Sequence, residues 1–362
     1  MVTPSLSIAK SRGLLVAGGL FVALGMAELT LRLLPPFGPE FILAGTTGSI
    51  DNRVFQDDVA LRVVLAANVD IDGFTTNALG IRGETLGPKA ADSHRVLAVG
   101  DSFTLGMQVE DGETFSDLLS TQLGPNIQVL NAGVPGYGTE QATELMRRLA
   151  SKVEADAVLL TVYTGNDFRD NSNWVQSPGM PTEPPPVRPP PVRPPQWTAA
   201  LAKYSRVVSN LLMFTALRNQ ESDFRLEEYK DEILPFVDHD HLNPLKPPTR
   251  TAMKRFLSTC FEVKVKCGVA IIPPAFVVHP ERVERTFTAF GLEPNLDQLD
   301  VPQDVMRRIV PKEVAVIDLT DALREGATEK PYLTFDPHFS AAGHAIAAEA
   351  LGPFVSQLVS EQ

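Results

Sequence analysis

The sequence predicts a doubly wound α/β domain, and one alternating pattern carries this prediction. Short, continuous apolar runs recur along the chain, separated by stretches in which apolar residues have helical spacing. Such runs indicate strands buried on both faces of a parallel sheet, and the intervening stretches indicate the helices that cover those faces. An apolar run at the N-terminus predicts, in addition, a transmembrane helix in front of this domain.

Five runs are the expected strands: VLAVG (96–100), IQVLNAG (127–133), AVLLTVY (157–163), VAIIP (269–273) and VAVIDL (314–319). Four stretches are the expected helices: 113–123, 139–152, 249–262 and 340–359. In the last of these, one helical face is apolar and contains Ala342, Ile346, Ala350 and Phe354. Ligands of a doubly wound sheet bind beyond the carboxyl ends of its strands, so we expect the functional site there.

The N-terminal segment, residues 1–36, is typical of membrane targeting. Lys10 and Arg12 precede an uncharged apolar run, and leucine-rich helical sequence continues to Pro35-Pro36, long enough for a span of about 20 residues. Two interpretations remain, a signal anchor with its basic end in the cytoplasm or a signal peptide cleaved after Ala27. Both place the remainder outside the plasma membrane, in the periplasm or at the cell surface. A buried helix of the domain is the less favoured alternative.

The rest of the chain divides into a core that contains the predicted strands and additions to that core. An N-terminal extension (37–92) includes the turn-rich stretch GFTTNALGIRG at 73–83, and the core comprises 93–177 and 245–362. Between the two core parts, PPPVR occurs twice in a proline-rich segment (178–196) that predicts an extended polyproline spacer. A helical insertion (197–244) follows, and it either caps the cleft or the membrane or packs against the side of the domain. Its apolar stripe contains Leu201, Tyr204, Val208, Leu211 and Leu212.

Charge and cysteine content restrict the partners and the compartment. The net charge of −12 argues against nucleic acid as a partner, because nucleic-acid binders concentrate Lys and Arg in a basic patch. Cys260 and Cys267 are the only two cysteines, and in an exported domain such a pair is a candidate for a disulfide. Because the stretch before Cys267 looks helical, a bond requires the chain to turn back, so both the bonded and the free state remain open.

Chemically reactive residues follow the predicted strands. A serine nucleophile requires a base within hydrogen-bond reach, a group that orients the base, and donors for the developing oxyanion. Ser102 follows the first strand, Gly133 the second and Asn166 the third, while Asp336 and His338 lie in FDPHFSAAGH near the C-terminus. Because the carboxyl ends of parallel strands meet at one edge, we expect these residues to converge.

The four stretches that contain these residues resemble the blocks of the SGNH (GDSL-type) hydrolases: GDSFTLG (100–106), NAGVPGYG (131–138), TGNDF (164–168) and DPHFSAAGH (336–344). The similarity extends over most of residues 73–353, and GFTTNALGIRG resembles the segment before the nucleophile in the membrane-anchored exported branch. The resemblance implies a three-layer α/β/α, flavodoxin-like sheet of about five parallel strands. It also implies ester hydrolysis without a metal or cofactor.

The resemblance assigns a role to each matching residue. Ser102 attacks an ester carbonyl, His338 accepts its proton and returns it to the leaving alcohol, and Asp336 orients the imidazole. The family pattern usually has its acid three residues before the histidine, where this chain has Phe335, so a backbone carbonyl would orient His338 if Asp336 points away. The oxyanion would be held by the backbone N–H groups of Ser102 and Gly133 and by the side-chain amide of Asn166.

Neighbouring polar residues are expected to have structural roles. We expect Asp101 and Asp167 to support the turns of the first and third blocks, and His344 to pack inside the last helix. The stretch VDHDHLN brings together His239, Asp240 and His241. Alternating residues in one short loop rarely supply the three or four converging ligands of a metal site, so no metal is predicted.

Taken together, the sequence predicts an exported, membrane-tethered serine esterase that removes short, acetyl-like acyl groups from envelope glycans or lipids. Two alternatives use the same features. An O-acyltransferase would move the acyl group from the same serine to a polysaccharide hydroxyl, and a non-catalytic envelope protein would use the fold to bind polysaccharide.

Overall fold

The computed structural model describes residues 5–33, 52–71, 73–176, 201, 205–211, 229–334 and 336–360. The proline-rich segment (178–196) lies outside the described residues, and so do Tyr204 and Leu212 of the predicted stripe.

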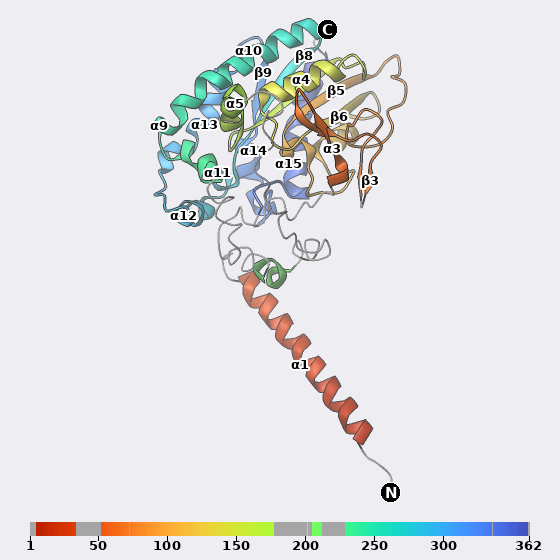
Figure 1. Cartoon of the computed structure of the whole chain (residues 1–362), viewed down its shortest axis with the longest axis vertical. Coiled ribbons are helices and arrows are strands. Elements are labelled where there is room, and N and C mark those ends of the chain that lie inside the picture. The colour runs from red at the N-terminus through yellow and green to blue at the C-terminus, as the bar shows by residue number, and fades with distance from the viewer. Residues whose placement is uncertain are drawn as a thin grey trace.

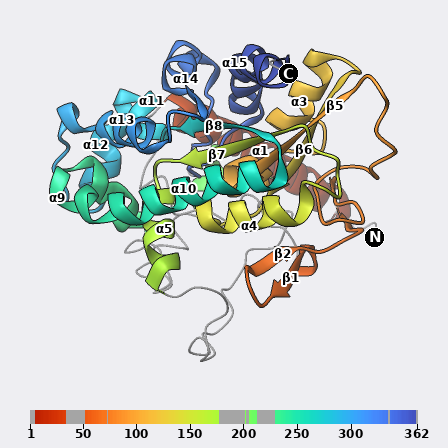
Figure 2. The same ribbon diagram turned by 90° about the horizontal axis from the view of Figure 1, so that it is seen from above.

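A five-stranded parallel sheet forms the centre of the domain (Figure 2). Its order is β6-β5-β7-β8-β9, so the chain first moves outward from β5 to β6 and then crosses back to β7. This reversal is the switch point at which doubly wound sheets bind their ligands. All five predicted strands are confirmed, as β5 (His94–Gly100), β6 (Ile127–Gly133), β7 (Ala157–Tyr163), β8 (Lys266–Ile272) and β9 (Ala315–Asp318).

Helices cover both faces of the sheet and confirm the three-layer α/β/α architecture. The four predicted helices are α3 (Phe115–Leu123), α4 (Thr139–Leu149), α10 (Lys246–Val263) and α15 (Ala341–Ser360). α4, α10 and α13 (Val301–Ile309) pack on one face, and α3, α14 (Thr320–Glu325) and α15 pack on the other. The shorter helices are α2 (Ser102–Leu105), α5 (Asp167–Gln176), α9 (His239–Leu242), α11 (Ala275–Val278) and α12 (Pro280–Ala289).

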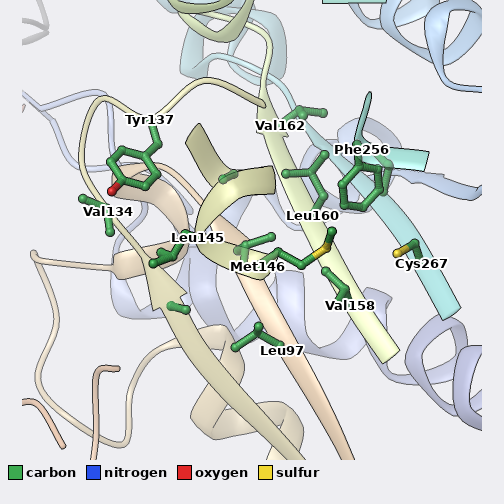
Figure 3. Close-up of a cluster of buried hydrophobic side chains, with 14 of the residues drawn as sticks. Leu97, Val134, Tyr137, Leu145, Met146, Val158, Leu160, Val162, Phe256 and Cys267 are labelled. Carbon is green, nitrogen blue, oxygen red and sulfur yellow. The ribbon is translucent and has the colours of Figure 1, made fainter. Parts of the chain in front are cut away.

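The central strand β7 shows why the apolar runs become parallel strands. All seven of its residues are buried, and successive side chains enter opposite layers. Val158 and Leu160 pack with Met146 of α4 and Phe256 of α10, as Figure 3 shows. Leu159 belongs to the opposite cluster, which α3 and α15 complete. A strand buried on both faces is composed mainly of apolar residues, which is the pattern visible in the sequence; Thr161 is the one small polar residue in β7.

The N-terminal extension forms two small antiparallel hairpins, which the sequence indicated only as turns. β1 (Phe55–Asp58) pairs with β2 (Arg62–Leu65), and β3 (Asp70–Ile71) pairs with β4 (Phe74–Thr75). The first hairpin is fixed to the core, because Tyr137 Oη donates a hydrogen bond of 2.5 Å to the Val63 carbonyl.

Cys260 of α10 and Cys267 of β8 form a disulfide, which resolves the alternative left open by the sequence. Lys264, at the end of α10, adopts a left-handed conformation with φ of 58°. This single residue ends the helix and turns the chain back into β8, so the two cysteines meet after only a short connection.

Helix α1 (Ser5–Leu33) extends away from the domain in Figure 1. Its segment Leu15–Leu33 is long and apolar enough to cross a membrane, and its described side chains are not buried by the rest of the chain. Length and composition of this kind are also found in signal sequences. Near its end, Glu28 accepts hydrogen bonds from Ser205 Oγ (2.8 Å) and from the N–H groups of Arg206 (2.9 Å) and Val207 (3.1 Å). One part of the insertion therefore lies against α1.

Candidate active site

Ser102 is the first residue of the four-residue helix α2, which begins directly after β5. The side chain of Asp101 caps this helix by accepting the Phe103 N–H at 2.9 Å. Asp101 thus supports the turn, as predicted from the sequence. The serine hydroxyl is placed at the carboxyl edge of the sheet, next to the switch point.

Two glycines allow α2 to lie directly on the ends of β5 and β6. Gly100 and Gly133 are paired in the sheet register, at the last position of each strand. A Cβ at Gly100 would collide with the hydroxyls of Thr104 and Thr161, and a Cβ at Gly133 would collide with Thr104 and with the backbone of Leu105. The close approach of α2 therefore excludes any side chain at either position.

A continuous chain of hydrogen bonds joins the serine, the histidine and the acid. His338 Nε2 lies 2.7 Å from Ser102 Oγ, and His338 Nδ1 lies 2.5 Å from Asp336 Oδ1. The same carboxylate oxygen accepts the backbone N–H of His338 at 2.9 Å, so a tight turn of two residues orients the acid toward the ring. Asp336 is fully buried. The alternative in which a backbone carbonyl orients His338 is wrong.

Burial and charge set the protonation of the histidine. Burial by itself lowers the pKa of His338, but the negative charge and hydrogen bond of Asp336, with a smaller contribution from Asp101, raise this pKa above its usual value. Burial also raises the pKa of Asp101 to about 6. The pKa of Asp167 is raised well above its usual value by burial and by the charge of Asp101. Asp167 accepts the Tyr163 N–H at 2.6 Å and so holds the third-block turn as predicted.

The second block contributes a different glycine from the one that the sequence analysis selected. The N–H of Gly133 donates to Asn131 Oδ1 at 3.1 Å, and Gly133 does not line the cleft at Ser102. Its assignment to the oxyanion hole is therefore wrong, because a donor that is already bonded inside the sheet cannot face a substrate. Gly136, three residues later, is exposed and lines the cleft with Ser102 and Asn166.

Arg82 holds the far end of helix α2, a role that the sequence did not reveal. Its Nη1 donates to the carbonyls of Leu105 and Gly106, both at 2.7 Å, its Nη2 to the Val109 carbonyl at 2.8 Å, and its Nε to Asp111 at 2.8 Å. Only 5% of Arg82 is exposed. The stretch GFTTNALGIRG therefore has a structural role. It places the buried guanidinium of Arg82 against backbone carbonyls that a four-residue helix leaves without intrahelical partners.

The cleft above Ser102 has a volume of about 350 Å³. Its walls come from the first hairpin, from α5, from the part of the insertion near Tyr229 and from the turn at Pro337 and His338. Among the described residues that line it, none has an aliphatic side chain of the Val, Leu, Ile or Met type. The described walls of the cleft therefore consist mainly of aromatic rings and of polar or charged groups, with Pro337 as a further apolar residue.

The remaining candidate histidines lie outside this constellation. His344 is buried in α15, where its Nδ1 accepts the Phe115 N–H at 3.2 Å, and burial lowers its pKa to about 3. This neutral, packed imidazole has the structural role that we expected. His241 pairs with Asp238 at 2.7 Å on the surface. Over the ranges that the structure describes, no group of three or more His, Cys, Asp or Glu side chains is arranged to hold a metal ion.

Comparison with known proteins yields similarities in structure only. No family model and no curated protein matches the chain. Among solved structures, a carbohydrate acetylesterase family member from Sinorhizobium meliloti matches at 10% identity and a TM-score of 0.41, over 74% of this chain and 99% of its own. An aryl esterase from M. smegmatis matches at 13% identity and a TM-score of 0.41, over 74% and 100%. A GDSL-like lipase from Bacteroides thetaiotaomicron matches at 11% and 0.37, over 73% and 88%.

We predict that Arg82→Met lowers the free energy of unfolding by about 3 kcal/mol or more, because buried carbonyls lose their donors and Asp111 loses its cation. Arg82→Lys, which retains the charge but not the planar set of donors, should cost about 1–2 kcal/mol. Urea unfolding of the full chain in detergent micelles measures both. Arg147→Met is the matched control, since Arg147 pairs with Glu144 on the surface and should change stability by less than about 0.5 kcal/mol. Equal losses in Arg82→Met and Arg147→Met would contradict the role of Arg82.

Proposed function

We propose that the chain is an exported serine esterase that hydrolyses short acyl esters, acetyl esters in particular, of envelope glycans or lipids. The observation that carries this proposal is the hydrogen-bonded chain from Ser102 through His338 to buried Asp336, opening onto a polar cleft. A hydroxyl is a weak nucleophile at neutral pH, and this arrangement supplies both the base and the group that orients it.

In the proposed reaction, Ser102 Oγ attacks the ester carbonyl while His338 Nε2 accepts its proton. Asp336 holds Nδ1–H and stabilises the imidazolium that forms. The imidazolium then gives its proton to the leaving alcohol as the carbon–oxygen bond breaks, which leaves an acyl-enzyme. Water, deprotonated by the neutral His338, attacks the acyl carbonyl, and the proton returns to Ser102 as the carboxylic acid leaves.

Three donors around the cleft support the stabilisation of the tetrahedral oxyanion. We assign them to the N–H groups of Ser102 and Gly136 and to the amide of Asn166. Asn166 also stabilises the charged form of Asp101, and a primary amide has a second N–H to direct at the cleft. Gly136 adopts a left-handed conformation with φ of 74°, which favours glycine at this position.

The lining of the cleft supports a short acyl group. A long acyl chain needs a continuous aliphatic wall to compensate for its ordering, and each buried methylene contributes about 0.8 kcal/mol. The described lining offers aromatic and polar groups instead. An acetyl group requires little apolar surface, so its ester is the better match.

The contact at Glu28 supports a retained anchor over a cleaved signal peptide. Glu28 is the residue directly after the alternative cleavage point at Ala27, and it binds the insertion at Ser205, Arg206 and Val207. Cleavage would remove the helix that positions this carboxylate. We therefore propose that α1 remains as an anchor and that the catalytic domain lies outside the plasma membrane.

For the esterase activity, we predict that the full chain in detergent micelles hydrolyses p-nitrophenyl acetate and that kcat/KM falls as the acyl chain lengthens. Ser102→Ala should abolish turnover because the nucleophile is lost. Asn166→Ala should lower kcat about 10²- to 10³-fold through the loss of one oxyanion donor. Release of p-nitrophenol measures all three effects.

A fluorophosphonate probe and intact-mass measurement provide the control for this experiment. The wild type should gain one adduct at Ser102, and the Ser102→Ala variant should gain none. A folded wild type that neither hydrolyses the esters nor reacts with the probe would refute the proposed function.

We also predict that kcat/KM rises with pH through an ionisation above 6.5, because His338 must be neutral to act as a base and its pKa is raised. Asp336→Asn removes the charge that favours the imidazolium, so the midpoint should move to lower pH while kcat falls about 10³- to 10⁴-fold. Asp238→Asn, a change at the surface pair with His241, should leave the profile unchanged. A midpoint that stays in place in Asp336→Asn would argue against the ion pair.

For the anchor, we predict that the mature protein from a bacterial host remains in the membrane after alkaline carbonate extraction and keeps residues 1–27 in its intact mass. A Gly25→Leu variant, whose bulky side chain blocks a signal peptidase, supplies the reference mass of the uncleaved chain. A soluble product beginning at Glu28 would establish the signal peptide instead.

A further inference from the structure

One wall of the cleft is built by two residues that are distant in the sequence. Arg62 begins β2 of the first hairpin, and Trp174 lies in α5, yet the guanidinium of Arg62 lies 5.0 Å from the centre of the Trp174 ring. Both side chains line the same cleft as Ser102. A cation over an indole face fixes the orientation of both groups.

The backbone at Arg62 supports a dedicated role for this side chain. Its φ is 71°, a left-handed conformation that is strained for a non-glycine residue. The turn is held from outside, because Asp58 accepts the N–H groups of Ala60 and Leu61 at 2.9 and 2.8 Å and pairs with Arg148 at 2.7 Å. Glycine would meet the backbone requirement of this position without strain, but glycine would bring no guanidinium to the cleft.

Planar polar groups surround this wall. Arg169 lies 3.3 Å from Asp170 and 3.1 Å from Glu232, so α5 and the insertion are joined by ion pairs at the cleft. Tyr229, also from the insertion, adds a second aromatic ring to the lining. The network thus places hydrogen-bond acceptors and donors next to aromatic surface.

We propose that the alcohol part of the ester is a carbohydrate, and that Trp174 with Arg62 forms the subsite for its sugar ring. This inference rests on the proposed esterase function and selects glycans over lipids. A sugar ring presents C–H groups on its faces, which pack against aromatic rings, and hydroxyls around its edge, which bind guanidinium and carboxylate groups. The described lining, with its aromatic rings beside charged and amide groups, matches these two features of a sugar ring better than the long alkyl chains of a lipid alcohol.

The test compares three acetate esters with the full chain in detergent micelles: mono-O-acetylated cellobiose, ethyl acetate and 1,2-dioleoyl-3-acetylglycerol. The wild type should prefer the cellobiose ester. In Trp174→Ala, the ratio of kcat/KM for the cellobiose ester to kcat/KM for ethyl acetate should fall at least tenfold, mainly through KM. Trp174→Phe should retain most of the ratio because the ring is kept.

Val175→Ala is the matched control, since Val175 neighbours Trp174 on α5 but is 55% exposed and does not line the cleft. Its ratio should equal that of the wild type. If Trp174→Ala does not fold, Arg62→Gln tests the same wall and should lower the ratio at least threefold.

The outcomes separate the two proposals. An unchanged ratio in the folded Trp174 and Arg62 variants, or a preference for the acetylglycerol, would overturn the carbohydrate subsite while leaving the esterase function intact. Failure of the folded wild type on all three esters would refute the esterase function itself.

Discussion

The close approach of helix α2 to the ends of β5 and β6 is the constraint on which the site depends. Because α2 lies so close to the strand ends, only glycine fits at positions 100 and 133. The close approach also leaves carbonyls at the end of a four-residue helix to be satisfied from outside, and Arg82 and Asn131 supply those hydrogen bonds. A helix this short has almost no stability of its own, so these contacts hold Ser102 in position.

Burial then affects the protonation of the ionisable groups around Ser102. Asp336 is inaccessible to water, and its carboxylate has the imidazole and the backbone N–H of His338 as partners, which makes the ion pair stronger than it would be at the surface. The same burial raises the pKa of Asp101 and Asp167, the two carboxyls that support the adjacent turns. The edge of the sheet thus combines the hydrogen-bonded pair Asp336–His338, to which we assign the proposed chemistry, with acidic side chains that position the backbone.

The cleft is assembled from additions to the sheet. The sheet and its loops supply Ser102, Asn166 and His338, while the first hairpin supplies Arg62 and the insertion supplies Tyr229. This division is common in α/β proteins, where the scaffold fixes the reaction and the loops determine which molecule reaches it. Here the contact of Glu28 with the insertion also connects helix α1 to the insertion, another part of which forms a cleft wall.

The five strands, the main helices and the candidate serine, histidine and acid could be predicted from the residues alone, because buried apolar runs and reactive blocks are local patterns. That Gly136 lines the cleft in place of Gly133 could not be predicted in this way, since a local pattern does not reveal which N–H is already bonded within the fold. Arg82, the disulfide and the wall of Arg62 and Trp174 likewise depend on contacts between distant segments. Such contacts follow from how the chain packs in three dimensions, and no local pattern of residue types records them.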